Sequence, residues 1–224
     1  EKDGPDTQPE KETGIAYCAG CYTNDKGYSV PCYWSGTKRV ELTGEGLLAG
    51  MVNAIYVKDG VVYCAGTYST AIKSGIPCYW EGKELHVLDI NGPGGATCIT
   101  ASNGIVYCGG QYTEGNTNYS CYWKGTSLFK LEKMPFQTHL KCIGVTESGT
   151  VYCAGSAEAE SYGSPFYWKD TTFHHLSRQD VWVNWAGEYW HHDGSVYNMD
   201  IKGESVYFGG SGDGTDHGSI PCKW

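Results

Sequence analysis

The sequence of 224 residues lacks any apolar run as long as the roughly 18 residues that a membrane-spanning helix needs. No long stretch repeats its apolar residues at the spacing of an amphipathic helix. Basic residues are few, 16 against 25 acidic ones, and the net charge of −9 argues against nucleic acids and anionic membranes as partners. What the chain has in excess is glycine, 32 residues, and aromatic side chains, 14%. This composition is typical of an all-β domain with many tight turns.

One sequence unit recurs five times. It reads GVVYCAGTYSTAIKSGIPCYW at residues 60–80, and the other copies begin near residues 14, 104, 149 and 204. The copies follow one another at about 45 residues, with a longer step of about 55 before the last, a period typical of β-propellers and related arrays. We therefore expect one domain over residues 14–224, preceded by a flexible leader at residues 1–13.

Each copy predicts up to four strands. In the second copy, two apolar runs flank the turn Asp59-Gly60, and two more runs follow after polar turns. The candidates for first strands are 52–57, 96–101, 140–146 and 196–201, and those for fourth strands are 38–43, 84–89, 127–132 and 172–176. The predicted fold is a five-bladed β-propeller of four-stranded antiparallel blades, in which the first blade lacks its first strand and the last blade lacks its fourth.

Two cysteine positions recur in these units. They hold Cys18, Cys64, Cys108 and Cys153 in the second strands, and Cys32, Cys78, Cys121 and Cys222 in the third. Disulfides 18–32, 64–78 and 108–121 are one interpretation. Free buried thiols are the favoured one, because the fourth copy replaces one cysteine of the pair with Phe166 and the fifth replaces the other with Phe208, as a compact hydrophobic position would allow. Directly opposed strand positions also suit disulfide geometry poorly.

The third strands end on a recurring tryptophan, in four copies as the pair Tyr-Trp. Its members are Trp34, Trp80, Trp123, Trp168 and Trp224. A large aromatic residue at the same place in every blade is expected to fill the space between blades, and this interpretation is preferred over a ring of ligand-stacking indoles.

The unit YCAG…PCYW…G is similar to the tandem Y-x-A-G…YW repeats of uncharacterised bacterial surface propellers, and this resemblance covers residues 14–224. In unit length and blade number the chain also resembles the tachylectin-type five-bladed lectins. The second resemblance concerns architecture, and no sugar-contacting residue can be carried over from it.

Ligand-binding residues are predicted in two places, where polar loops gather or where the repeat is interrupted. The first is the set of loops between second and third strands (23–29, 69–75, 113–120, 157–163 and 212–219), with Tyr22, Tyr68 and Tyr112 at the mouths of three of them. The second is the insertion 177–195, and its candidates are Trp182, Trp185, Tyr189, Trp190, His191 and Asp193. The insertion is interpreted as a structural plug or a ligand platform, with metal binding or catalysis a weaker alternative. No metal or cofactor is expected.

Catalysis is not expected either, because the first strands carry one carboxylate, Asp200, and glycosidases use two. A polar leader before a Gly- and Tyr-rich domain is typical of a processed export protein. We expect an extracytoplasmic protein, secreted or held at a bacterial surface, for example by a lipid anchor on a removed segment; a cytosolic protein is the alternative. The predicted function is a non-catalytic module that binds glycans, with a protein-binding or structural surface domain, or a glycoside-processing enzyme, as alternatives.

Overall fold

The computed structural model describes residues 14–158, 164–176, 194–213 and 219–223. The expected leader and residues 177–193 of the insertion lie outside the described residues. Within the described part the chain forms strands and turns without a helix, so no described segment could cross a membrane as a helix. The all-β prediction is confirmed.

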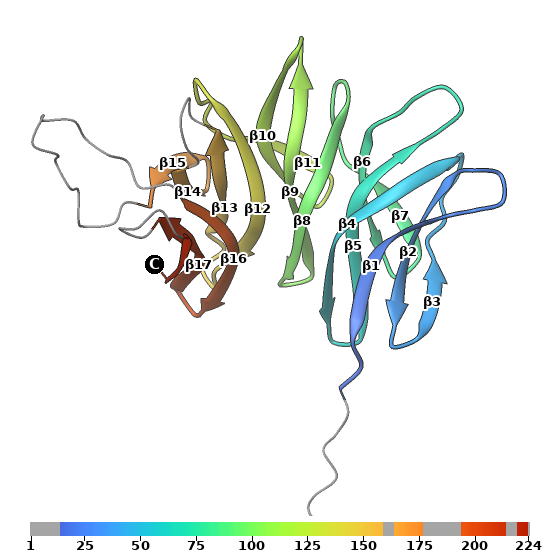
Figure 1. The fold of residues 1–224 in the computed structure, drawn as a ribbon, viewed down its shortest axis with the longest axis horizontal. Helices are drawn as coiled ribbons and strands as arrows, with labels where there is room; N and C mark the ends of the chain where they lie inside the picture. Colours follow the sequence, from blue (N-terminus) through green and yellow to red (C-terminus); the bar gives the residue numbers. More distant parts are fainter. Residues whose placement is uncertain (1–13, 159–163, 177–193, 214–218, 224) are drawn as a thin grey trace, which may run out of the picture.

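The described strands form five antiparallel sheets in chain order (Figure 1). The first sheet contains β1 (Tyr17–Thr23), β2 (Ser29–Ser35) and β3 (Lys38–Glu41). The second contains β4 (Ala49–Lys58), β5 (Val61–Ser69), β6 (Ile76–Glu81) and β7 (Glu84–Val87). The third contains β8 (Gly94–Ser102), β9 (Ile105–Glu114), β10 (Thr117–Lys124) and β11 (Ser127–Lys130). The fourth contains β12 (Gln137–Val145), β13 (Val151–Glu158), β14 (Ser164–Lys169) and β15 (Thr172–His175). The last contains β16 (Gly194–Lys202), β17 (Ser205–Asp213) and β18 (Ser219–Lys223).

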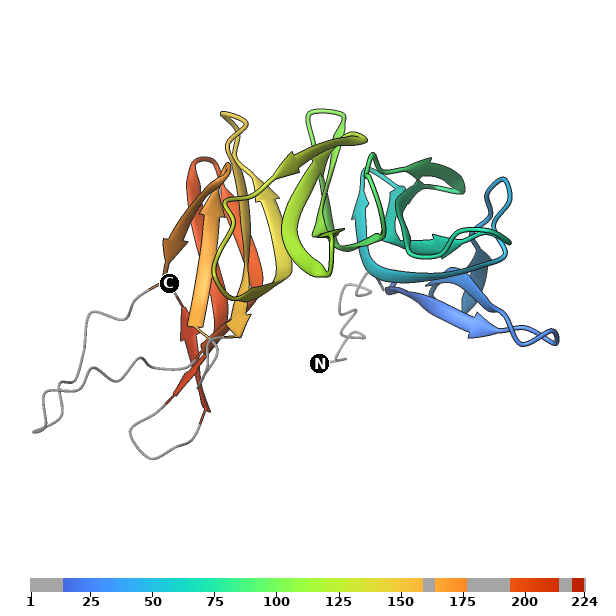
Figure 2. The same ribbon diagram turned by 90° about the horizontal axis from the view of Figure 1, so that it is seen from above.

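The sheets follow one another along a curved row (Figures 1 and 2). From the second sheet onward, each sheet uses its own first strand to pack on the first two strands of the sheet before it. Thus β4 lies against β1 and β2, β8 against β4 and β5, β12 against β8 and β9, and β16 against β12 and β13. The first and last sheets stand at opposite ends of the row in both views, and the described strands do not close a ring. The four-stranded antiparallel sheets are therefore confirmed, whereas the closed five-bladed ring stays a prediction.

Two-residue turns connect the first and second strands of the second and third sheets. Asp59 and Gly60 have φ angles of 51° and 78°, and Asn103 and Gly104 have 51° and 72°. Two successive positive φ angles are those of a type I′ turn, whose twist matches that of the flanking strands. The Asp-Gly signal in the sequence predicted this turn correctly.

Each first strand of the four-stranded sheets contains a β-bulge that faces a glycine. The register of β4 on β5 shifts at Asn53, close to Gly66, and a Cβ on Gly66 would overlap the carbonyl oxygen of Met51. The bulges of β8 and β12 face Gly110 and Gly155 in the same way. Glycine is needed at these positions because it lets the bulged backbone approach the second strand so closely.

The recurring tryptophans fill the contacts between sheets. Trp80, Trp123 and Trp168 are completely buried, as expected for these three. Trp80 Nε1 donates to the carbonyl oxygen of Thr43 at 3.0 Å, and Trp123 Nε1 donates to that of Asp89 at 2.9 Å, so each indole is bonded to the connection that leaves the preceding sheet. Trp168 Nε1 is buried without a hydrogen-bond partner among the described residues.

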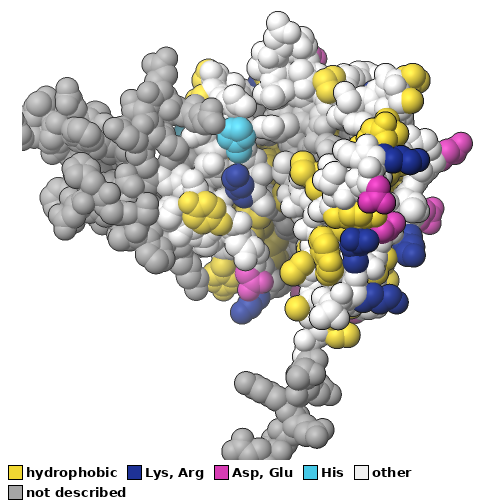
Figure 3. Space-filling view, turned by 45° about the vertical axis from the view of Figure 1, so that its right-hand side comes forward, with side chains coloured by type: hydrophobic (Ala, Val, Ile, Leu, Met, Phe, Trp, Pro, Cys, Tyr) yellow, Lys and Arg dark blue, Asp and Glu magenta, His cyan; other side chains and the backbone are white. Residues whose placement is uncertain are grey.

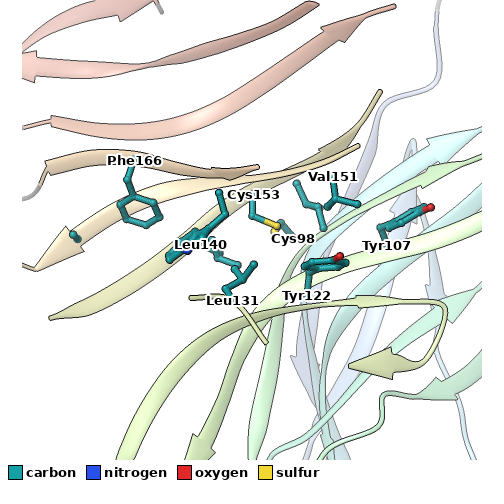
Figure 4. Close-up of a cluster of buried hydrophobic side chains, with 11 residues drawn as sticks. Cys98, Tyr107, Tyr122, Leu131, Leu140, Val151, Cys153 and Phe166 are labelled. Atoms are coloured by element: carbon teal, nitrogen blue, oxygen red, sulfur yellow. The ribbon is translucent and has the colours of Figure 1, made fainter. Parts of the chain in front are cut away.

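Cysteines take part in the same apolar contacts. Figure 4 shows Cys98 of the third sheet beside Cys153 of the fourth, between Leu131 and Leu140 on one side and Val151 on the other. The ten cysteines up to Cys153 are all free thiols, in agreement with the favoured interpretation, and the side chain of Cys222 lies outside the described part. Burial raises the pKa of the Cys98 thiol to about 12.

The expectation that the paired cysteines oppose each other directly is wrong. Cys64 lies opposite Trp80, and Cys78 lies opposite Gly66. The register of β5 on β6 therefore places the two cysteines of the unit two residues apart along the ladder. They lie on the same face of the sheet, because side chains alternate with a period of two.

Candidate binding site

The predicted site residues of the insertion, Trp182, Trp185, Tyr189, Trp190, His191 and Asp193, lie outside the described residues. Their role as a plug or as a ligand platform stays a prediction. The three tyrosines of the other predicted group, Tyr22, Tyr68 and Tyr112, occupy corresponding positions near the ends of β1, β5 and β9.

Tyr22 is held by the side chains of β3. Its hydroxyl donates to Glu41 Oε1 at 2.6 Å, and this hydrogen bond is the first cause of the raised pKa of Tyr22. The guanidinium of Arg39 lies 3.7 Å from the ring centroid, where a cation–π contact is favourable. One face of the ring is therefore already covered within its own sheet.

Tyr68 and Tyr112 are buried, with 7% and 3% of their surface exposed. Tyr68 belongs to the apolar cluster between the first and second sheets. Tyr112 lies under the Lys130 ammonium, 4.8 Å from the ring centroid, and packs at 5.6 Å against the ring of Tyr119. The buried ring of Tyr112 therefore packs beneath Tyr119, which is more exposed.

Tyr119 belongs to the wall of a cavity of about 220 Å³, which we call the loop pocket. The pocket is lined by residues 116–120, at the start of β10, and residues 131–138, where the chain crosses from the third sheet to the fourth. Only the first segment overlaps a loop that the sequence predicted, 113–120. The second segment was missed, since its recurring residue, Leu131, is a buried one like Leu42 and Leu88 and does not indicate a site.

The floor of the loop pocket is a hydrogen-bonded contact between the third and fourth sheets. The hydroxyls of Ser120 and Thr138 lie 2.7 Å apart, and both side chains are buried. Gln111 Nε2 donates to the carbonyl oxygen of Thr138 at 2.6 Å. These bonds fix the two lining segments relative to each other, so the floor is preformed.

Amide and hydroxyl groups line the open side of the loop pocket. Asn116, Thr117, Asn118 and Gln137 are exposed. The side-chain oxygen of Asn118 accepts a hydrogen bond of 2.8 Å from the Thr113 hydroxyl, which leaves its amide N–H groups for another acceptor. The side-chain amides of Asn116 and Gln137 can both donate and accept hydrogen bonds, a property that suits ligands rich in hydroxyl groups.

An ion pair and an apolar wall complete the loop pocket. Lys133 Nζ lies 2.5 Å from Glu114 Oε2 and 4.1 Å from the centroid of the Tyr119 ring. Hydrogen bonds from Lys133 and Lys130 lower the pKa of the Glu114 carboxyl, so the pair stays charged at neutral pH and its charges offset each other. The lining segment 134–136 contributes methionine, proline and phenylalanine.

A second cavity, of about 450 Å³, lies where β4, β8, β12 and β16 end, and we call it the inner-strand cavity. Asp200, the carboxylate that the sequence singled out, lines it together with Glu147 and Lys58. Glu147 was missed because it belongs to the turn after β12 and not to a strand. Asp200 lies 3.8 Å from Lys202 Nζ, and Lys58 Nζ donates to the carbonyl oxygen of Ala101 at 3.5 Å.

Among the described residues, no group of three or more His, Cys, Asp or Glu side chains could hold a metal ion. A comparison with protein-family models gave no match, and a comparison with curated proteins gave none either. The two cavities and the exposed side chains therefore carry the functional interpretation.

Proposed function

We propose that this protein is a non-catalytic binding module that holds uncharged glycans in the loop pocket. The observation that supports this most is the combination within one preformed pocket of amides, hydroxyls and an apolar wall. The hydroxyl groups of a glycan would bond to the amides and hydroxyls of the pocket, and its C–H surfaces would pack on the apolar wall. At about 220 Å³ the pocket is smaller than the roughly 300–1,000 Å³ of sites that enclose drug-sized ligands, which favours one sugar unit of a longer chain.

The charge of the molecule favours an uncharged ligand. The net charge of −9 repels polyanions. At the loop pocket itself, Glu114 is paired with Lys133 and Lys130, and the carboxylate of Glu132 accepts the backbone N–H of Phe173 at 2.9 Å. The charged side chains are thus engaged with one another or with the backbone, and the amides remain for the ligand.

The architecture that goes with this proposal is a five-bladed propeller in which each sequence unit forms one blade and the two end blades are incomplete. Its support is the period of the sequence and the packing of each described sheet on the next. An extracytoplasmic location, in a secreted or surface-held protein, is part of the same proposal and rests on the composition of the leader and of the domain.

A panel of immobilised uncharged oligosaccharides, probed with the intact protein and with Asn118→Ala and Gln137→Ala, tests the proposed function. We expect binding by the intact protein and a loss of roughly three- to tenfold for each variant, since each removes about one hydrogen bond. Asn198→Ala is the matched control, because Asn198 is an exposed amide on β16 of the last sheet and does not line the loop pocket.

Failure of every oligosaccharide to bind would refute the glycan proposal. Binding that Asn198→Ala weakens and Asn118→Ala leaves unchanged would refute the loop pocket as its site. In both cases the circular dichroism spectra and urea midpoints of the variants must match those of the parent protein.

A glycoside-processing enzyme is the second candidate, favoured by the presence of two carboxylates, Glu147 and Asp200, in the inner-strand cavity. Glycosidases use a pair of carboxylates as acid and as base or nucleophile. Release of reducing ends from a polysaccharide mixture, abolished by both Glu147→Gln and Asp200→Asn, would support the enzyme over the binding module.

A further inference from the structure

The first sheet has an edge that the complete sheets do not have. In the second, third and fourth sheets the strand that carries the YCAG or YCGG motif lies between two partners. Within the described part of the chain, the corresponding strand β1 is bonded to β2 alone. The backbone groups along its other edge are those that a first strand would pair with, and unpaired strand edges are templates for strand addition.

β1 nevertheless keeps the glycine that an added strand requires. At Gly66, Gly110 and Gly155 a Cβ would overlap a carbonyl oxygen of the bulged first strand. At Gly20, the corresponding position of β1, the nearest described atom to such a Cβ is a ring carbon of Trp34, at 3.9 Å. The described structure thus gives no steric reason for glycine at residue 20, whereas a bulged strand along the edge would give one.

The cysteine two residues before this glycine leads to the same conclusion. Cys64 lies opposite Ile55 of β4, and Cys108 lies opposite Ile99 of β8, and both thiols are completely buried. Cys18, at the corresponding position of β1, is exposed. Cys18 lacks the isoleucine of a first strand, and it also lacks a preceding sheet such as the one against which Cys64 packs. Figure 3, which brings this end of the molecule forward, shows hydrophobic side chains at the surface among charged ones.

We propose that the edge of β1 binds an extended peptide segment of a partner polypeptide as a fourth, antiparallel strand with its bulge opposite Gly20. The segment would carry the pattern shared by the three complete first strands: apolar, any residue, small, isoleucine, any residue, apolar. The pattern is read from VNAIYV (52–57), ATCITA (96–101) and LKCIGV (140–145). Backbone hydrogen bonds would supply affinity, and the small residue and the isoleucine would supply specificity.

The peptide AGMVNAIYVK, the sequence of β4, is the probe for this interaction. Labelled with a fluorophore and titrated with the intact protein, it is expected to bind with a rise in fluorescence anisotropy. A peptide carrying Ile55→Asp is the matched control and should bind at least tenfold more weakly, because its carboxylate would face the apolar position beside Cys18.

Two glycine variants of the protein separate binding from folding. Gly20→Ala is expected to leave the urea midpoint of the protein unchanged, since its Cβ meets no described atom closer than 3.9 Å, and to lower peptide affinity at least tenfold. Gly66→Ala, at the corresponding position of a complete sheet, is expected to lower the urea midpoint clearly.

Each of the following outcomes would overturn the proposal. The first is the absence of peptide binding to the intact protein and to a chain that begins at Gly14; binding to the shorter chain alone would assign the edge to residues 1–13 instead. The second is equal peptide affinity of Gly20→Ala and the parent. The third is a concentration-dependent dimer, measured by sedimentation, that Gly20→Ala dissociates, which would assign the edge to a second copy. None of these depends on the loop pocket or on glycan binding.

Discussion

At the scale of single residues, Trp80, Trp123 and Trp168 are all completely buried but differ in one hydrogen bond. Trp123 Nε1 donates to Asp89, whereas Trp168 Nε1 has no partner among the described residues. The neighbouring backbone bonds do not differ: the N–H of Asp89 donates to the carbonyl oxygen of Thr126 at 2.9 Å, and that of Glu132 donates to the carbonyl oxygen of Thr171 at 3.1 Å. The two sites therefore differ in the bond of the indole itself.

This difference predicts unequal costs for the same substitution. Trp123→Phe and Trp168→Phe remove similar apolar surface, but only the first breaks a hydrogen bond, and the second removes a buried donor without a partner. We expect Trp123→Phe to lower the free energy of unfolding by about 1 kcal/mol more than Trp168→Phe, measured by urea denaturation. An equal or larger loss for Trp168→Phe would contradict the assignment of these bonds.

From single residues of the sequence, the buried core positions could be predicted, but the residues of the loop pocket could not. The tryptophans and cysteines were expected between the sheets, because an apolar residue type that recurs in every unit marks a buried position. Tyr68 and Tyr112 were predicted to face a ligand, and the sequence could not show that both rings are buried. The burial of Tyr112 under Lys130 depends on a residue of another strand, which the repeat does not preserve.

At the scale of elements, the strand positions were predictable and the crossings between sheets were not. Predicted first strands at 52–57 and 96–101 lie inside β4 and β8, which begin a few residues earlier. The earlier residues precede a bulge, and a bulge interrupts the alternation from which a strand is recognised. The crossing 131–136 has no such pattern at all, so half of the loop pocket could not be predicted.

The type I′ turns make a prediction for single elements. Gly60→Ala places a Cβ on a residue with φ of 78° and should cost about 1–2 kcal/mol of stability. Gly209→Ala is the matched control, because no described atom lies within 4 Å of its Cβ and its φ is not positive. Urea midpoints would contradict the turn assignment if Gly60→Ala cost no more than Gly209→Ala.

At the scale of the whole molecule, buried thiols and phenols make stability depend on pH. Burial raises the pKa of Cys64 from 9.0 to about 12 and that of Tyr122 from 10.0 to about 12. In the unfolded chain these groups lose their protons at lower pH than in the folded protein. Their contribution to stability is therefore complete below about pH 9 and is lost as the pH rises toward 12.

We accordingly expect the free energy of unfolding to be level from pH 7 to 8 and to fall steadily between pH 9 and 11. Urea titrations at fixed ionic strength measure this. The slope should become shallower in Cys64→Ala, because that variant removes one of the thiols that ionise only on unfolding. A stability that stays level or rises between pH 9 and 11 would contradict the burial of these groups.

The whole-molecule account also joins architecture to function. Five sheets in a row bring the start of β10 beside the crossing before β12, and this juxtaposition creates the loop pocket. A uniform repeat alone would create such a pocket at every crossing. The particular side chains of residues 116–120 and 131–138 are what make this one polar and preformed.

The most direct test of the central claim is a titration of the isotopically labelled protein with the best-bound oligosaccharide of the panel, followed by two-dimensional NMR. The account predicts that the largest chemical-shift changes fall on residues 116–120 and 131–138, and that Asn118→Ala diminishes them. Changes confined to residues 177–193 or to the inner-strand cavity would contradict it.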